Sequence, residues 1–146
     1  MEREILLSIR GTQRTPQAEP ETIELTTEGW LARTETGYVL SYMESALTGL
    51  EGVKTEFLIA PDRIVLRRSG ALQTQMVFAE GEETQSLYQM EFGALLVTIC
   101  AKTVKSSITA DGGSIELCYT LSIEDTPAGM IDYHIVAAPK TSPRCD

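Results

Sequence analysis

The sequence predicts an all-β fold, a single antiparallel β-barrel of about 8–10 short strands. Apolar and polar residues alternate with a period of two along most of the chain, as in strands that bury one face. Turn residues interrupt this alternation about every 8–12 residues, the spacing of a barrel or a sandwich. No window keeps the i, i+3, i+4, i+7 apolar spacing of an amphipathic helix, so no long helix is expected.

About ten strands are expected from eleven short alternating segments, which are bounded by turn residues. The segments are, in order, residues 5–9, 23–27, 38–42, 53–59, 64–68, 75–78, 85–90, 95–100, 104–108, 115–123 and 130–137. Tight turns are expected at Pro61-Asp62, at Glu80-Gly81-Glu82 and at Asp111-Gly112-Gly113. The 95–100 segment is apolar on both faces and is therefore expected to be central. Only residues 44–50 could form a single helical turn.

The chain of 146 residues suits one domain. We expect the barrel to span residues 1–138 and residues 139–146 to form a flexible tail, because that segment has no alternation. Residues 12–21 carry Pro16 and Pro20 among polar residues and are expected to form a mobile loop. Strict alternation would place Trp30 on an acidic outer face. A β-bulge at Gly29 would return it to the apolar face, and we favour the bulge over an exposed Trp30 used for contact.

The charge balance argues against two classes of partner. Lys and Arg number 12 and Asp and Glu number 21, which gives a formal net charge of −9. Such a chain repels nucleic-acid phosphates and anionic membranes unless it carries a local basic stripe, and no stripe is present in the sequence. The longest uncharged apolar stretch, Phe92–Ala101, is about half of the ~20 residues that a membrane helix needs. We expect no nucleic-acid partner and no membrane partner.

The N-terminus and the cysteines both point to the cytoplasm. The start Met1-Glu2-Arg3-Glu4 is not basic, and the apolar run that follows it ends at Arg10, which does not fit a secretory signal. Three cysteines without close spacing fit neither a disulfide framework nor a zinc site. We expect Cys100 and Cys118 to be buried and Cys145 to be exposed.

A search for catalytic and metal-binding groups finds no convincing constellation. Gly49 and Gly52 lack the lysine of a phosphate-binding loop and are expected to be turn glycines. The acidic pairs Glu82-Glu83 and Glu124-Asp125 lie in apparent turns, where acids are usually solvated. His134 alternates with apolar neighbours and is expected on the surface, with no second ligand at metal spacing. The sequence therefore predicts no enzyme activity, no cofactor and no metal.

Arg68 is the most informative charged residue, because it alternates with Ile64 and Leu66 and therefore shares their face of the strand. We call this relation between residues on one face of a strand parity. That parity directs its guanidinium toward the barrel interior or its rim. A buried arginine must be paired, and Glu44 or Glu91 could be the partner. The alternative is that the strand ends at Arg68 and the side chain reaches water.

Several blocks of sequence together resemble one family. They are residues 41–52, residues 68–71, residues 75–81, Tyr88 with Phe92-Gly93, and Gly112-Gly113 before residues 116–119. This pattern is similar to the YwiB-like bacterial proteins, a family of unknown function. The resemblance spans about Ile5 to Val136. It implies a calycin-type, lipocalin-like β-barrel and supplies no catalytic residues. The family tends to have Thr-Pro where this chain has Met90-Glu91, so no role is carried over to that loop.

A barrel of about eight strands has an interior that is either filled or able to hold one small ligand. We expect a small, partly apolar ligand inside, because aromatic and charged residues can point there. The candidate ligand-binding residues are Tyr42, Glu44, Arg68, Phe78, Tyr88 and Tyr119. The alternative is a protein-interaction module or a homo-oligomeric assembly module with a filled core, for which a homodimer is the simplest form.

Overall fold

The computed structural model describes residues 2–15, 18–44, 51–70, 73–90 and 93–139, and its regular elements are all strands. They are β1 (Glu2–Arg14), β2 (Glu21–Arg33), β3 (Tyr38–Met43), β4 (Val53–Ile59), β5 (Ile64–Gly70), β6 (Thr74–Phe78), β7 (Glu83–Met90), β8 (Gly93–Ser106), β9 (Gly113–Ile123) and β10 (Thr126–Pro139). Within those ranges no helix has the length and hydropathy that crossing a bilayer requires. The predicted all-β class is confirmed.

The ten strands form one antiparallel sheet that curls into a nearly closed barrel. The strand order is β6-β5-β4-β3-β2-β1-β10-β9-β8-β7, so the first and last strands pair in its middle, with Leu7 opposite Ala137. The two edges, β6 and β7, are consecutive strands joined by a tight turn, in which the Glu82 amide donates to the Ala79 carbonyl over 2.9 Å. The Thr84 hydroxyl donates to the Val77 carbonyl over 2.7 Å and joins the edges where no strand ladder does. We call this junction the seam.

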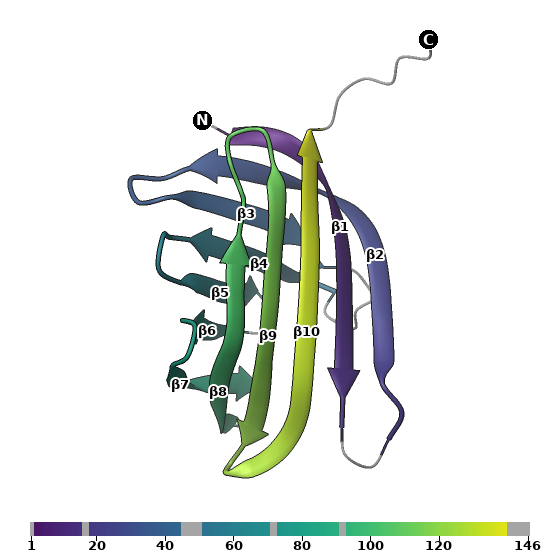
Figure 1. The fold of residues 1–146 in the computed structure, drawn as a ribbon, viewed down its shortest axis with the longest axis vertical. Coiled ribbons are helices and arrows are strands. Elements are labelled where there is room, and N and C mark those ends of the chain that lie inside the picture. Colours follow the sequence, from purple (N-terminus) through teal and green to yellow (C-terminus); the bar gives the residue numbers. More distant parts are fainter. Residues whose placement is uncertain (1, 16–17, 45–50, 71–72, 91–92, 140–146) are drawn as a thin grey trace.

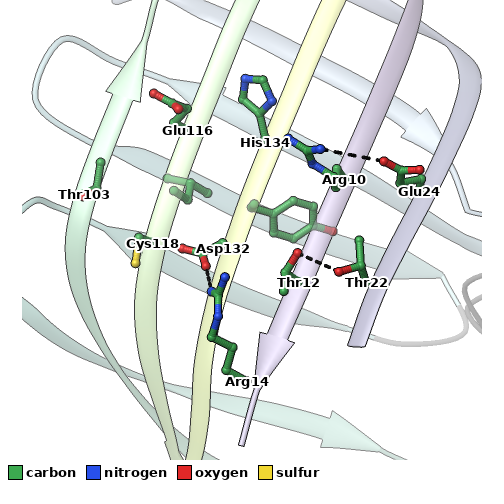
Figure 2. Close-up of a pocket in the computed structure, with 12 residues that line it drawn as sticks. Arg10, Thr12, Arg14, Thr22, Glu24, Thr103, Glu116, Cys118, Asp132 and His134 are labelled. Carbon is green, nitrogen blue, oxygen red and sulfur yellow. Dashed lines mark hydrogen bonds and ion pairs between the residues drawn. The ribbon is translucent and has the colours of Figure 1, made fainter. Parts of the chain in front are cut away.

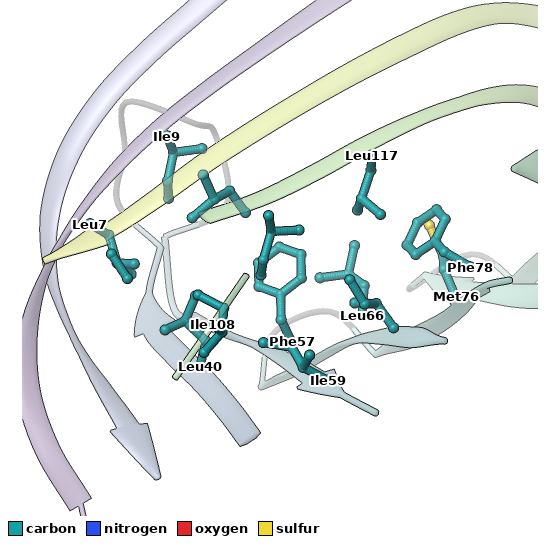
Figure 3. Close-up of a cluster of buried hydrophobic side chains, with 14 of the residues drawn as sticks. Leu7, Ile9, Leu40, Phe57, Ile59, Leu66, Met76, Phe78, Ile108 and Leu117 are labelled. Atoms are coloured by element: carbon teal, nitrogen blue, oxygen red, sulfur yellow. The ribbon is translucent and has the colours of Figure 1, made fainter. Parts of the chain in front are cut away.

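The barrel has two sides that cross each other. In Figure 1, β1, β8, β9 and β10 run along the long axis, whereas β3 to β6 cross behind them at a steep angle. Inward side chains of both sides meet in one apolar core, in which Leu7, Ile9 and Leu117 face Leu40, Phe57, Leu66, Met76 and Phe78 (Figure 3). Burial of each such large side chain stabilises the fold by about 1.5–3 kcal/mol.

Most strands extend beyond the expected segments, as β2 does to Arg33 and β10 does from Thr126, and two of the differences have a clear physical cause. The predicted 95–100 and 104–108 segments form the single strand β8, which continues through a register shift between Ala101 and Thr103. That shift is a β-bulge, and it breaks the alternation at Lys102 because one extra residue enters the strand. The expected loop 12–21 is also too long: β1 continues to Arg14 and β2 begins at Glu21, because the polar residues there pair across strands.

The expected bulge at Gly29 is wrong, and Trp30 lies on the outer face. β1 and β2 keep a regular register through Ile5 opposite Gly29 and Glu4 opposite Trp30. The Trp30 residue is 37% exposed. Gly29 itself occupies the inward position, where a Cβ would lie 2.5 Å from the Ser41 carbonyl oxygen and 2.8 Å from Leu7. The glycine therefore serves close packing and not a bulge.

The expected burial of two cysteines is also wrong. Cys100 is exposed and Cys118 is half-buried, because each shares the outward face of its strand while its apolar neighbours point inward. His134 lies on the outer face between inward neighbours, as the alternation predicts, and is half-buried. Residues 45–50, Glu91 and 140–146 with Cys145 lie outside the described residues, so the expected helical turn and most of the tail do too. Pro139 still belongs to β10, opposite Ile5.

The predicted turns are present. The Ala60 amide donates to the Arg63 carbonyl over 2.9 Å around Pro61-Asp62. Gly112 and Gly113 adopt positive φ values of 112° and 139° in the connection between β8 and β9, as the Asp-Gly-Gly signal predicts.

Candidate functional site

A cavity of about 330 Å³ extends into the barrel beside the apolar core. Its rim includes the exposed residues Gln13, Glu21 and Ile23, and its inner end includes the buried residues Tyr42 and Glu44. Ile23 is 52% exposed although it lies on the inward face of β2. The remaining lining residues are Ile9, Gly11, Thr12, Leu25, Arg68, Met76, Tyr119, Leu121, Ile131 and Tyr133.

Strand register explains why polar side chains gather at the inner end. Tyr42 pairs with Thr55, Thr55 with Arg68, and Arg68 with Thr74, so one inward-facing row crosses β3, β4, β5 and β6. Glu44 follows β3 two residues after Tyr42 and therefore points to the same side. Its backbone amide donates to the Val53 carbonyl over 2.9 Å, which fixes its position at the strand end.

Glu44 and Arg68 form a buried ion pair on this row. The Glu44 side chain is 2% exposed, the Arg68 side chain is 12% exposed, and Arg68 Nε lies 4.0 Å from Glu44 Oε2. The Thr55 hydroxyl donates to the same carboxylate oxygen over 2.5 Å. Tyr42 also forms a side-chain hydrogen bond with Glu44. The carboxylate is thus held by two hydroxyl groups and by the nearby positive charge.

The tyrosines at the inner end form a connected set. Side-chain hydrogen bonds link Tyr133 with Tyr42 and with Arg68, which donates to the phenolic oxygen. Tyr133 also packs edge-on against Phe57, with ring centroids 6.2 Å apart. Its ring lies over Gly11, the residue opposite it in β1, which has no side chain to compete for the space.

Burial keeps these hydroxyl groups protonated. Burial raises the pKa of Tyr42 most strongly, and the nearby Tyr133 and Glu44 raise it further. Burial also raises the pKa of Tyr119 and the pKa of Tyr133, while the Arg68 charge partly opposes the increase at both. Ordinary tyrosine already ionises only near pH 10, so these hydroxyl groups remain neutral hydrogen-bonding groups at physiological pH.

The cavity therefore combines a polar floor with apolar walls. The floor offers hydroxyl groups and a guanidinium, and the walls include Leu25, Leu121 and Ile131. Small-molecule sites have this composition, with a few placed polar groups in an apolar lining, and volumes of roughly 300–1,000 Å³. No group of three or more His, Cys, Asp or Glu residues that could hold a metal occurs in the described ranges.

The structure brings together four of the six predicted residues, namely Tyr42, Glu44, Arg68 and Tyr119. Arg68 points inward and pairs with Glu44, as parity predicts, and the alternative in which it reaches water does not apply. Phe78 does not line the cavity. It is fully buried in the core against Tyr119, with ring centroids 4.7 Å apart.

The sixth predicted residue is Tyr88, and two further residues near the ion pair were not predicted. Tyr88 lies in β7 opposite Leu95, and its side chain is outside the described residues. The sequence-based reasoning missed Thr55 and Tyr133. Parity contains the signal for both, because Thr55 alternates with Val53 and Phe57, and Tyr133 alternates with Ile131 and Ile135.

A larger hollow of about 850 Å³ lies over the outer face of β1, β2, β8, β9 and β10 (Figure 2). Both arginines in it are paired, because Arg10 lies 3.9 Å from Glu24 and Arg14 pairs with Asp132, and Glu116 adds one further negative charge. These side chains are about half exposed, so the pairs contribute little stability and present no concentrated charge. We prefer the smaller interior cavity as the site, because its polar groups are buried and strand register holds them in place.

Comparison with known proteins agrees with this architecture. Residues 7–135 match the model of a domain of unknown function, DUF1934. The chain belongs to the DUF1934 family. One relative, the uncharacterized β-barrel protein YwiB of Bacillus subtilis (strain 168), is 30% identical over 105 residues, which cover 72% of each protein. The crystal structure of the YwiB protein from Bacillus subtilis matches with a TM-score of 0.83 and 25% identity, covering 96% of this chain and 94% of that one. The family and the β-barrel fold of this DUF1934 chain are thereby shown.

Proposed function

We propose that this barrel binds a small, partly apolar molecule in its interior cavity and catalyses no reaction. The observation that carries the proposal is the buried Arg68–Glu44 pair at the inner end of an apolar-walled cavity. A buried ion pair is seldom more stabilising than well-packed apolar residues of the same size. Its position where a ligand's polar group would lie favours a role in binding.

The ionisable groups of the floor favour binding over catalysis. The tyrosine pKa values are raised, so none of these hydroxyl groups is activated as a base near neutral pH. Glu44 accepts hydrogen bonds from Thr55 and Tyr42, which hold its carboxylate in one position. A group held in this way positions a ligand more readily than it transfers a proton.

One observation favours the alternative, an interaction module or a homodimer. Trp30, Leu6 and Val136 are exposed on the outer face of the neighbouring strands β2, β1 and β10. Exposed apolar side chains that cluster on one face can mark a contact with a second copy of the chain. We retain this as the second candidate function.

The proposal also includes a cellular setting. We propose a cytoplasmic protein whose partners are a small molecule and, in the alternative, a second copy of itself. The net charge of −9 supports the exclusion of nucleic acids and anionic membrane surfaces as partners.

Native mass spectrometry of the mildly purified full chain tests the proposal. We expect a monomer with an additional small mass that is lost on denaturation. A bare monomer from which no small molecule can be extracted, together with no binding of small amphipathic probes, would refute the ligand-binding proposal. A bare dimer that Trp30→Thr converts to monomer would establish the alternative in its place.

A further inference from the structure

Most polar groups at the inner end of the cavity are bonded to one another. The Glu44 carboxylate accepts hydrogen bonds from the hydroxyl groups of Thr55 and Tyr42. Arg68 lies 4.0 Å from the same carboxylate and donates to the phenolic oxygen of Tyr133, which is also bonded to Tyr42. Each of these groups already has partners within the protein, so none of them needs a ligand.

The charges around the cavity provide no unpaired counter-charge for an ion. Glu44 and Arg68 offset each other at the inner end. The third charge among the described lining residues is Glu21, which is exposed at the rim and screened by the solvent. A charged head group that moved from water to the inner end would lose its hydration without gaining such a counter-charge, which is costly. The cavity therefore favours an uncharged molecule.

Apolar side chains continue along the inward face of the long strands toward the mouth of the cavity. In β10, Ile135 is fully buried and Ile131 is half-buried, and in β9, Leu117 is buried and Leu121 is half-buried. In β2, the inward-facing Ile23 is 52% exposed. A molecule with an apolar body would remove this surface from water, which favours binding.

Tyr119 carries a buried hydroxyl group without a hydrogen bond in the described part of the chain. The residue is 4% exposed and lines the cavity. It interacts electrostatically with Tyr133 and with Arg68, which places its phenolic group at the inner end. Side-chain hydrogen bonds hold Tyr42 and Tyr133, but none holds Tyr119 among the described residues. A buried hydroxyl without a partner is unfavourable, and an oxygen atom of a ligand would satisfy it.

We propose that the ligand is an uncharged molecule with an apolar body and one hydroxyl or carbonyl oxygen, which forms a hydrogen bond with the Tyr119 hydroxyl. This inference rests on the proposed function and names the chemical class of its ligand. The apolar body lies along Leu25, Leu121 and Ile131 toward Ile23 at the rim. The cavity volume of about 330 Å³ is near the lower end of the range for ligand pockets, which fits a molecule of medium length.

Isothermal titration calorimetry of the full chain at neutral pH with octan-1-ol, octanoate and octylamine tests the charge selection. The three probes share a tail, and the head group is uncharged in the first, negative in the second and positive in the third. We expect octan-1-ol to bind the wild type at least about 10-fold more tightly than either ion. Glu21→Gln removes the rim charge, and we expect it to leave this order unchanged.

Tyr119→Phe and Tyr38→Phe form a matched pair of variants that test the hydrogen bond. Tyr38 is half-buried and does not line the cavity. We expect Tyr119→Phe to weaken octan-1-ol binding about 3- to 10-fold, which is the value of one hydrogen bond, and Tyr38→Phe to leave it unchanged. Without a ligand, Tyr119→Phe should unfold at a temperature no lower than that of the wild type, because its hydroxyl has no hydrogen bond to lose. A lower unfolding temperature with unchanged octan-1-ol affinity would assign the hydroxyl a structural role and overturn the inference.

The remaining outcomes separate the two proposals. If octanoate or octylamine binds the wild type as tightly as octan-1-ol, the inference of an uncharged ligand is wrong and the binding function stands. The same conclusion follows if Glu21→Gln raises the affinity for octanoate to that for octan-1-ol, because the rim charge would then make the distinction. If no probe binds and no molecule co-purifies with the protein, both proposals fail.

Discussion

At the residue scale, the buried pair of Glu44 and Arg68 is asymmetric. Arginine cannot lose its charge in a protein, whereas a carboxylate can take up a proton when its partner is removed. Glu44 also keeps the hydroxyl hydrogen bonds of Thr55 and Tyr42 when Arg68 is changed. Removal of the Glu44 charge and removal of the Arg68 charge should therefore destabilise the fold by different amounts.

Glu44→Gln should lower the free energy of unfolding by about 3–5 kcal/mol, because it removes the negative charge that lies 4.0 Å from the buried guanidinium. Arg68→Met should cost less, and the double variant should recover part of the loss of Glu44→Gln. Urea denaturation of the two single variants and the double variant measures the coupling. Additive effects of the two substitutions would contradict direct coupling between these groups.

Because three tyrosines are buried, we expect the fold to lose stability at alkaline pH. Burial raises the folded-state pKa of Tyr42, Tyr119 and Tyr133 above the ordinary value of 10.0. Their contribution is fully present below pH 10 and is lost as the pH rises beyond it, because the unfolded chain then releases protons that the folded chain retains. Absorbance at 295 nm should show these phenols ionising only together with unfolding.

Tyr42→Phe provides the control for this prediction. It removes a buried phenol, so the loss of stability between pH 10 and pH 12 should be smaller than in the wild type. Ionisation of all tyrosines near pH 10 without loss of the fold would show that the inner end of the cavity is open to water.

Parity predicted much of the site at this scale, because an alternating strand fixes which side chains share a face. Arg68 and Tyr42 point inward for that reason, and Tyr133 could have been added by the same rule. Parity could not show that Phe78 packs into the core and not around the cavity. That distinction depends on how the two sides of the barrel cross, because the crossing brings together side chains that are far apart in the sequence.

At the scale of elements, Gly29 marks the position where β2 begins to pair with β3. It is opposite Tyr42 in that pairing, and it is also opposite Ile5 in β1. A side chain there would meet the Ser41 carbonyl and Leu7. Local pattern suggested a bulge at this glycine because Trp30 seemed misplaced, but backbone approach between neighbouring strands is invisible in the sequence.

Gly29→Ala should therefore destabilise the fold by about 1–3 kcal/mol through overpacking. Gly11→Ala is the matched control, because a Cβ at Gly11 would meet only Tyr133, at 4.0 Å. Thermal or urea denaturation of both variants measures the difference. Equal stabilities would mean that β2 has room at Gly29 and that another cause selects the glycine.

The predicted strands and turns match the structure wherever alternation is regular. The exception in β8 has a physical cause, since the extra residue at Lys102 shifts the alternation and looks like a strand boundary. The surface position of Cys100 has a related cause: β8 is apolar on both faces, so composition alone could not assign its inward face.

At the scale of the whole molecule, no strand ladder crosses the seam between β6 and β7, so we expect the barrel wall to open there most readily. β6 and β7 carry a ladder on one side only, and the Thr84 hydroxyl bridges them near the turn. Amides in β6 and β7 that face the seam should exchange with deuterium faster than those between β1 and β10. Uniform protection around the barrel, measured by hydrogen exchange with NMR, would show that the wall is continuously bonded.

The strand order has a further consequence for how the chain folds. Every spatial neighbour in the sheet is also a neighbour in sequence, except that β1 lies beside β10. A circular permutant with its ends joined by a short linker between β10 and β1, and opened at Gly81, would run from β7 through β10 and β1 to β6. All of its pairings would be hairpins between successive strands, so its contact order would fall. Since lower contact order speeds folding, stopped-flow refolding of this permutant should be faster than that of the natural chain, with the same barrel as its product.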